Sequence, residues 1–379
     1  MKIGIITFHA SYNCGSILQC RALVQLLKQR GHNVQVINYS NIGQQQVYSV
    51  FLPNNSLRNI VKNILSLGGR AQIEDHCTQY QNYIDTNLPL SGDVISDHAG
   101  LKDLQKYDAI IAGGDQVWNV SIADFDTAYF LDFAKNTYKF SFSPSLGARN
   151  INEDENHAQY RDLLLQFDDI SCREVNGQKW LEQLTGREVQ LVADPTLLLP
   201  KEVWKGLTEF NAKLPERFIF YYAFAYSPEN NAAVERIAKH YDIPVIVIDA
   251  KQWYIRRLMK YPHFILLNQT GPNAFLQLMD KATYVLTTSF HGTIFSLNFG
   301  KQFLYIETKN HDIKDDRTSF ILKQMGLSDR YLRPDQIQSE ALEKPIDRQS
   351  VLKELENLRT TANEYLDLNL ARAEEGLSK

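Results

Sequence analysis

Several features that mark other classes of protein are missing from this chain of 379 residues. No apolar run approaches the roughly 18 residues that a membrane-spanning helix needs. The segment from Lys2 to Phe8 resembles a strand and lacks the charged, apolar and small-residue order of a signal peptide. We therefore expect a cytoplasmic protein with no spanning helix.

Clustered metal ligands and a large positive charge are missing as well. The four cysteines are scattered without a CxxC pair, and the nine histidines show no HExxH spacing. This pattern favours reduced thiols, and we expect neither a bound metal nor a cofactor. The formal net charge of -4 argues against a nucleic-acid binder driven by bulk positive charge.

The chain instead shows short apolar runs that alternate with helix-period segments, a pattern typical of parallel sheets joined by crossovers. Strands are expected near residues 3–8, 34–39, 108–112, 138–143, 168–172 and 189–193, and again near 217–224, 244–248, 263–267, 283–287 and 302–306. Two prolines between Asp194 and Pro200 mark a boundary between the two series. The length also exceeds what one core usually supports.

These observations predict an α/β protein with two doubly wound, Rossmann-like domains that face each other across a cleft. The first domain covers residues 1–200 and contains an insertion at 40–100, rich in Asn, Gln and Ser, that carries no motif we can name. The second covers residues 201–379. It ends in amphipathic surface helices between Gln349 and Leu377, which could pack back on the first domain.

Chemistry in such a cleft is expected where strands end. The clearest candidate is the segment from Thr288 to Thr293, in which a strand leads directly into a helix N-terminus at His291. Ser289, Gly292 and Thr293 would let an anion approach unpaired amides there, and His291 can serve as an acid or base. The alternative is a simple helix cap with a satisfied histidine.

Other expected strand ends carry polar residues too. Asn13, Gly15 and Ser16 precede the first long helix and could bind an anion, whereas Arg173 offers a fork for phosphate or carboxylate. A basic cluster containing Lys309 and Arg317 follows the strand near 302–306. A sugar-recognition set follows the strand near 108–112, namely Asp115, Gln116, Trp118 and Asn119. Each of these groups could also be purely structural, and Trp118 could be a buried core residue.

Taken in order, these segments resemble the polysaccharide pyruvyl transferase family. The resemblance rests on Asn13 to Gln19, Gly113 to Asn119, Ser141 to Gly147, Ser171 to Glu174, Asp194 to Leu198 and Ser289 to Gly292. It implies a fold similar to GT-B glycosyltransferases. Two positions depart from the family pattern: Cys14 replaces a common aromatic residue, and Ser289 stands where an Arg-x-His arrangement usually has its arginine.

The implied activity is transfer of pyruvate from phosphoenolpyruvate to hydroxyls of a sugar in a cell-surface polysaccharide, such as a capsule or exopolysaccharide, or in its lipid-linked precursor. The product is a ketal. On this basis His291 and Arg173 are assigned to catalysis. The donor is assigned to the second domain and to Asn13, Gly15, Ser16, Ser289, Gly292, Thr293, Lys309 and Arg317. The acceptor is assigned to the first domain and to Asp115, Gln116, Trp118 and Asn119.

Two alternatives remain at this stage. A nucleotide-sugar glycosyltransferase would use the same cleft, and a non-catalytic glycan binder would have lost transfer. A lipid-linked acceptor would bring the protein to the inner face of the membrane, although the sequence shows no anchor. The acceptor sugar and the oligomeric state are not determined by the sequence.

Overall fold

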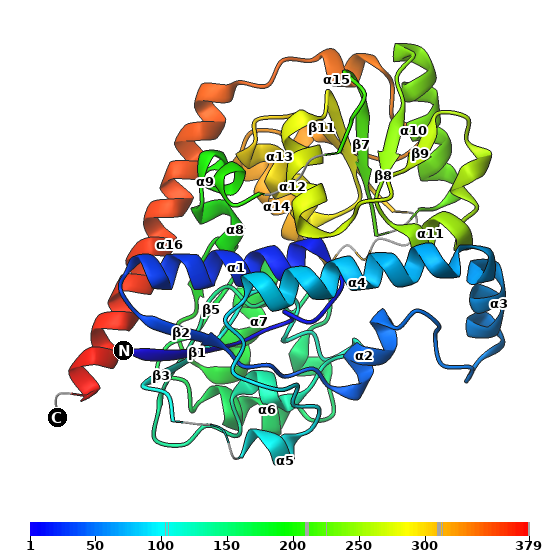
Figure 1. The fold of residues 1–379 in the computed structure, drawn as a ribbon. Helices are drawn as coiled ribbons and strands as arrows, with labels where there is room; N and C mark the ends of the chain where they lie inside the picture. Colours follow the sequence, from blue (N-terminus) through cyan, green and yellow to red (C-terminus); the bar gives the residue numbers. More distant parts are fainter. Residues whose placement is uncertain are drawn as a thin grey trace.

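The computed structural model describes residues 1–377 except 103, 105, 209–211, 225, 309–311 and 313. Its strands form two large parallel sheets and a third sheet of two short strands (Figure 1). The first sheet has the order β2-β1-β3-β4, formed by Asn33–Val36, Lys2–Ile6, Ala109–Ala112 and Tyr138–Ser141. Two short strands, β5 (Ser171–Cys172) and β6 (Gln190–Leu191), pair in parallel and continue this layer beside β4.

The second sheet has six strands in the order β12-β11-β10-β7-β8-β9. Their bounds are Tyr331–Leu332, Gln302–Ile306, Tyr284–Thr287, Ile219–Tyr222, Val245–Val247 and Phe264–Leu266. Every pairing between the described strands is parallel. The predicted α/β class with parallel sheets is therefore confirmed.

Each sheet is buried on both faces, as doubly wound folds require. In β7, Phe220 joins the core that contains helix α12 (Gly271–Lys281), whereas Tyr221 points into a second core with Val234 of helix α10 (Pro228–Tyr241). In the first sheet, the neighbouring residues Ile5 and Ile6 likewise belong to two different cores on opposite faces of the sheet. The largest core runs without interruption from β1 to β11, so the two sheets are joined by apolar packing.

Helices connect most of the consecutive strands. In the first 200 residues they are α1 (Cys14–Gln29), α2 (Ile42–Tyr48), α3 (Leu57–Ser66), α4 (Arg70–Asn87), α5 (His98–Leu101), α6 (His157–Leu164), α7 (Val175–Thr185) and α8 (Pro195–Leu198). The later ones are α9 (Lys201–Gly206), α10, α11 (Ala250–Ile255), α12, α13 (Phe290–Asn298), α14 (Arg317–Gln324), α15 (Glu340–Glu343) and α16 (Arg348–Leu377). Of the helices in the described residues, none combines the length and apolar character needed to cross a bilayer.

The C-terminal segment forms one long helix, α16, of 30 residues. It runs from the second sheet along one side of the molecule to the first (Figure 1). There the Tyr365 hydroxyl donates to the Ser141 carbonyl at 3.0 Å, and Arg30 pairs with Asp367 at 2.6 Å. The chain thus returns to its N-terminal part at its end.

The segment 40–100 folds into α2, α3, α4 and α5, and reaches across to the second sheet. Gln79 of α4 accepts a hydrogen bond from the Thr270 amide at 2.8 Å, and Gln72 accepts one from the Tyr254 hydroxyl at 3.1 Å. Figure 1 shows α4 crossing the middle of the molecule toward α11. The division of the chain into domains at residues 200 and 201 stays a prediction.

Candidate functional site

His291 lies where the two sheets face each other. Strand β10 ends at Thr287, and Ser289 caps α13 by accepting a hydrogen bond from the Gly292 amide at 3.3 Å. The first turn of α13 therefore carries the buried His291 ring toward the start of α1. A Cβ atom at Gly15 would lie 2.1 Å from His291 Nδ1. Only glycine at position 15 allows the ring to occupy this place.

A chain of buried polar contacts continues from His291. Its Nε2 lies 3.5 Å from Oδ2 of Asp194, and Nη1 of Arg173 donates to the same oxygen at 2.7 Å. The Arg173 Nη2 atom lies 3.4 Å from Oδ1 of Asp115, whose other oxygen accepts from the Ser16 hydroxyl. Five side chains from separate segments of the chain thus form one network, which we call the charge network: Ser16, Asp115, Arg173, Asp194 and His291.

The electrostatics of the charge network favour ionised carboxylates. Burial by itself raises the pKa of Asp194, but His291 and Arg173 outweigh burial and hold that pKa far below the usual range. Burial also raises the pKa of Asp115, but Arg173 and His291 lower it by more, so its net pKa lies below the usual value. Two carboxylates face one guanidinium here.

Glu174 behaves differently from its neighbours. Its Oε1 accepts a hydrogen bond from the Leu146 amide at 2.6 Å, whereas its buried Oε2 has no partner among the described residues. Burial raises the pKa of Glu174 to about 7, although Arg173 and Arg317 oppose the shift. The structure thus holds a carboxyl group that titrates near neutral pH next to Arg173.

We expect Glu174→Gln to change how stability depends on pH. Because the folded-state pKa lies above the ordinary 4.5, the stabilisation from protonated Glu174 is complete below 4.5 and is lost as the pH rises through about 7. When the pH is raised from about 5 to about 9, the free energy of unfolding of Glu174→Gln should increase by roughly 3 kcal/mol relative to that of the wild type. Denaturant unfolding at both pH values measures this, with the exposed Glu188→Gln as the control. Parallel pH profiles for wild type and Glu174→Gln would contradict the assignment.

Arg317 and Arg173 of the charge network both lie near the ring of Phe290. The Phe290 ring lies 4.8 Å from the Arg173 guanidinium carbon and 5.8 Å from that of Arg317. Asp315 holds Arg317 with two hydrogen bonds, at 2.8 and 2.6 Å. Two arginines therefore flank one ring at the start of α13. The donor-binding role of Arg317 stays a prediction, and Lys309 lies outside the described residues.

The loop after β3 was predicted to supply four acceptor-binding residues, but only one of them, Asp115, belongs to the charge network. Asp115 has a left-handed backbone with φ 73°, which turns its carboxylate toward Arg173. The Gln116 side chain accepts a hydrogen bond from Asn119 at 2.8 Å, and Asn119 also accepts one from the Ser121 hydroxyl at 2.7 Å. These two amides mainly hold their own loop together.

The acceptor role predicted for Trp118 needs correction. Its side chain is fully buried, its Nε1 donates to the Tyr129 carbonyl at 2.9 Å, and its ring stacks on Phe130 at 5.6 Å. A sugar ring has no access to it. Because the indole already has its hydrogen bond and its apolar contacts inside the core, Trp118 is a packing residue.

The predicted anion contacts through helix amides also need correction. The Asn13 side chain accepts hydrogen bonds from the Gly15 and Ser16 amides at 2.9 and 3.4 Å. In α13, the Ser289 hydroxyl takes the Gly292 amide, and the Ser289 carbonyl takes the Thr293 amide at 3.0 Å. These amides are therefore occupied by side-chain and helix bonds. Positive charge near His291 comes from Arg173 and Arg317 instead.

Asp194 is the residue that the sequence interpretation missed. It was placed at a domain boundary because of the prolines that follow it. A signal was available, since Asp194 is also a polar residue just after an expected strand, like the other candidates. Its side chain additionally caps α8 by accepting from the Thr196 amide at 3.0 Å. Within the part of the chain that the structure describes, no three His, Cys, Asp or Glu side chains gather as metal ligands.

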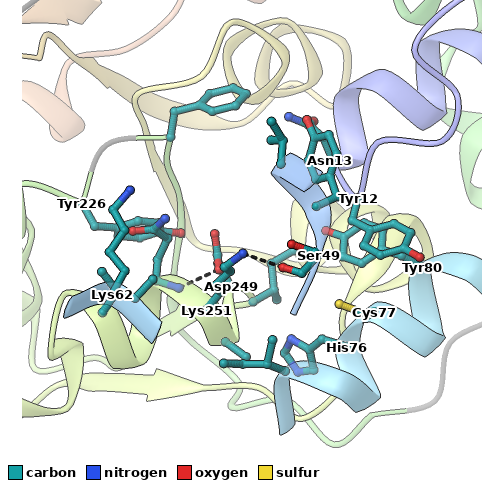
Figure 2. Close-up of a pocket in the computed structure, with 18 of the residues that line it drawn as sticks. Tyr12, Asn13, Ser49, Lys62, His76, Cys77, Tyr80, Tyr226, Asp249 and Lys251 are labelled. Carbon is teal, nitrogen blue, oxygen red and sulfur yellow. Dashed lines mark hydrogen bonds between the residues drawn. The ribbon is translucent and has the colours of Figure 1, made fainter. Parts of the chain in front are cut away.

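A cavity of about 500 Å³ opens between the 40–100 segment and the second sheet (Figure 2). Five tyrosines supply much of its wall, namely Tyr12, Tyr48, Tyr80, Tyr222 and Tyr226. The Tyr12 and Tyr80 rings stack at 5.6 Å. Asn13 lines the cavity and lies two residues before Gly15, which contacts His291. The sequence did not predict this cavity because its wall comes from distant segments without a motif.

Charged groups stand among these tyrosines. Lys62, Asp249 and Lys251 line the cavity, and Lys251 Nζ donates to the Ser49 carbonyl at 2.7 Å, as Figure 2 shows. Burial lowers the pKa of Lys251 and raises that of Asp249. Aromatic faces combined with a few polar groups are typical of sites for small polar ligands such as sugars.

The fold and the buried network between the two sheets define a GT-B-like protein. UDP-GlcNAc 2-epimerase from Neisseria meningitidis, bound to UDP-GlcNAc, has 12% identity and a TM-score of 0.52, with 98% of this chain and 100% of that chain covered. The E. coli heptosyltransferase WaaC has 12% identity and a TM-score of 0.41, covering 90% and 98%. The Streptomyces nogalater glycosyltransferase SnogD has 12% identity and a TM-score of 0.44, covering 98% and 99%. At 12% identity, the likeness to the epimerase shows the fold alone.

The family follows from the sequence itself. Residues 13–310 match the polysaccharide pyruvyl transferase family, and the chain belongs to that family. The resemblance stated from the strand-end motifs is confirmed. Among curated proteins no significant match is found.

Proposed function

We propose that this protein transfers pyruvate from phosphoenolpyruvate to hydroxyls of a sugar in a cell-surface polysaccharide or its lipid-linked precursor, forming a ketal. The observation that carries the proposal is the charge network, in which Arg173 and His291 share one carboxylate oxygen of Asp194. All of its members lie within the segment that matches the pyruvyl transferase family.

The donor has a phosphate and a carboxylate, so its site needs cationic side chains. Arg173 and Arg317, which both lie close to the Phe290 ring, meet this need. The buried Nε of Arg173 has no partner among the described residues, which leaves it one donor for a substrate. Because the Arg173 and Asp194 side chains are almost fully buried, we propose that donor entry requires the two halves to move apart.

His291 is the proposed general acid. A proton transferred from it to the methylene carbon of phosphoenolpyruvate makes C2 electrophilic, and a sugar hydroxyl attacks C2. Phosphate then leaves, the second hydroxyl closes the ketal, and the two hydroxyl protons return to His291 and to phosphate. Asp194 would orient the ring and stabilise its charged form.

The acceptor is proposed to occupy the tyrosine-lined cavity. Its volume of about 500 Å³ suits a small ligand or one sugar unit of a larger chain. Asn13 connects the cavity to the Gly15–His291 contact, so a hydroxyl held there would lie near the general acid. The acceptor roles of Gln116 and Asn119 stay predictions, and neither residue is among those that line this cavity. The proposed division puts residues 1–200 on the acceptor side and residues 201–379 on the donor side, with Arg173 reaching the donor from the first.

Ligand-induced stabilisation tests the proposal. Phosphoenolpyruvate at roughly 100 times its Kd should stabilise the wild type by about 2.7 kcal/mol. The shift should largely vanish in Arg173→Lys, because an ammonium group cannot reproduce the guanidinium fork. Each variant is compared with its own ligand-free melting temperature, so lost stability does not affect the result. Arg372→Ala, which removes an exposed ion pair with Asp169, should keep the full shift.

The same titration includes nucleoside diphosphates. Stabilisation by a nucleotide alone would replace the proposal with a glycosyltransferase, and stabilisation by neither ligand would favour a glycan-binding protein. When phosphoenolpyruvate binds, release of inorganic phosphate that depends on an added sugar acceptor is the expected second result.

A further inference from the structure

Helix α3 exposes its apolar face to solvent, whereas an ordinary surface helix buries that face. Four of its five apolar side chains are exposed, with exposed fractions from 36% at Ile60 to 82% at Leu57. The spacing places them on one stripe of the helix, continued by the following turn: Leu57, Ile60, Val61, Ile64 and Leu67. We call these five residues the outer stripe. Its size and continuity distinguish it from scattered surface leucines.

The opposite, polar face fixes this orientation. Asn59 donates to the Pro53 carbonyl at 3.0 Å, and Asn63 donates to the Leu52 carbonyl at 2.8 Å while accepting from the Leu52 amide at 2.9 Å. Rotating the helix to bury its outer stripe would break these bonds. Figure 1 shows α3 at the edge of the molecule beside α11. Among the described residues, nothing buries the side chains of the outer stripe, each of which keeps at least 36% of its surface exposed.

The charge around α3 is positive. The first 73 residues of the chain contain no Asp or Glu, and the exposed Arg58 follows Leu57 on the same helix. Burial, together with the cations Arg58 and Arg256, lowers the pKa of Lys62 on the cavity side of the helix. An apolar stripe beside a basic side chain fits a surface that is both apolar and negatively charged.

We propose that α3 docks on an anionic lipid bilayer, with the outer stripe at the boundary between headgroups and acyl chains. Arg58 would then meet a lipid phosphate. A water-soluble protein partner could also cover an apolar stripe, but the absence of any acidic residue in this part of the chain favours an anionic surface.

The location of α3 relates membrane docking to the proposed acceptor site; this step rests on the proposed function. Asn59 and Lys62 line the tyrosine-walled cavity, so α3 would separate the bilayer from that cavity by one helix thickness. A sugar carried on a lipid would enter the cavity from the membrane side.

Cosedimentation with vesicles tests the docking. Wild-type protein should bind vesicles of phosphatidylcholine with phosphatidylglycerol at least about tenfold more tightly than vesicles of phosphatidylcholine alone, and added salt should weaken the difference. The triple variant Leu57→Ser, Val61→Ser, Ile64→Ser should lose at least about tenfold in binding to the anionic vesicles. The matched control is Leu352→Ser with Leu368→Ser, two exposed leucines on α16, which should bind like the wild type.

Three results would overturn the docking proposal: no wild-type binding, equal loss in the α16 control, or a wild-type dimer in analytical ultracentrifugation that the triple variant converts to monomer. The last would assign the outer stripe to a second copy of the chain. The phosphoenolpyruvate-induced melting shift should persist in the triple variant. That shift fails only if the proposed function fails, so the two proposals are tested separately.

Discussion

His291→Asn is expected to slow turnover by about 10² to 10⁴-fold while changing phosphoenolpyruvate affinity little. Asparagine can keep a polar group beside Asp194 but cannot deliver a proton to the methylene carbon of the donor. The large expected effect follows from the position of the ring, which contacts Gly15 and lies 3.5 Å from Asp194 Oδ2.

Steady-state phosphate release and calorimetric donor binding measure the two quantities separately. A lower affinity with unchanged turnover would make His291 a binding residue and would leave the general acid unassigned. The control is His240→Asn, an exposed histidine at the end of α10 that should behave like the wild type.

Asp194→Asn is expected to cost about 3–5 kcal/mol of folding stability, the usual loss when one partner of a buried ion pair is removed. The side chains of Arg173 and Asp194 are only 1% and 0% exposed. An asparagine could still cap α8 through its oxygen, but its amide group would then face the Arg173 guanidinium, donor against donor. Little of the lost attraction can be replaced by water in such a buried place.

The pH dependence gives this prediction a second readout. Because the pKa of Asp194 is lowered on folding, its stabilising effect is present above the ordinary value of 3.8 and fades as the pH falls below it. The wild type should therefore lose its advantage over Asp194→Asn only in acid. Asp367→Asn, which breaks the exposed pair with Arg30, should cost less than about 1 kcal/mol at neutral pH. Equal losses in the two variants would contradict a central role for Asp194.

Local sequence patterns were sufficient to predict the architecture. The apolar segment near residues 283–287 forms β10, and the polar residues after it start α13, because side-chain periodicity and helix capping act over a few neighbouring residues. Family membership was equally accessible, since it depends on the order of short motifs along the chain. The prediction that His291, Arg173 and Asp115 stand at strand ends rested on the same logic.

Which polar residues meet was decided by distances between segments far apart in sequence. Asp194 was interpreted as a boundary residue until the structure brought it within 2.7 Å of Arg173 and 3.5 Å of His291. Trp118 was given a ligand role because its neighbours are polar, yet tertiary packing against Phe130 buries it.

The amino-acid sequence by itself determined the alternation of strands and helices, the local caps and the family, because these depend on neighbours in the chain. Only the tertiary structure decided the pairing within the charge network, the walls of the cavity and the outward direction of the apolar face of α3. The physical reason is that burial and charge pairing depend on what other segments bring to a residue. The pattern Leu57, Val61, Ile64 predicts a helix with an apolar face, but only packing shows that this face points to the solvent.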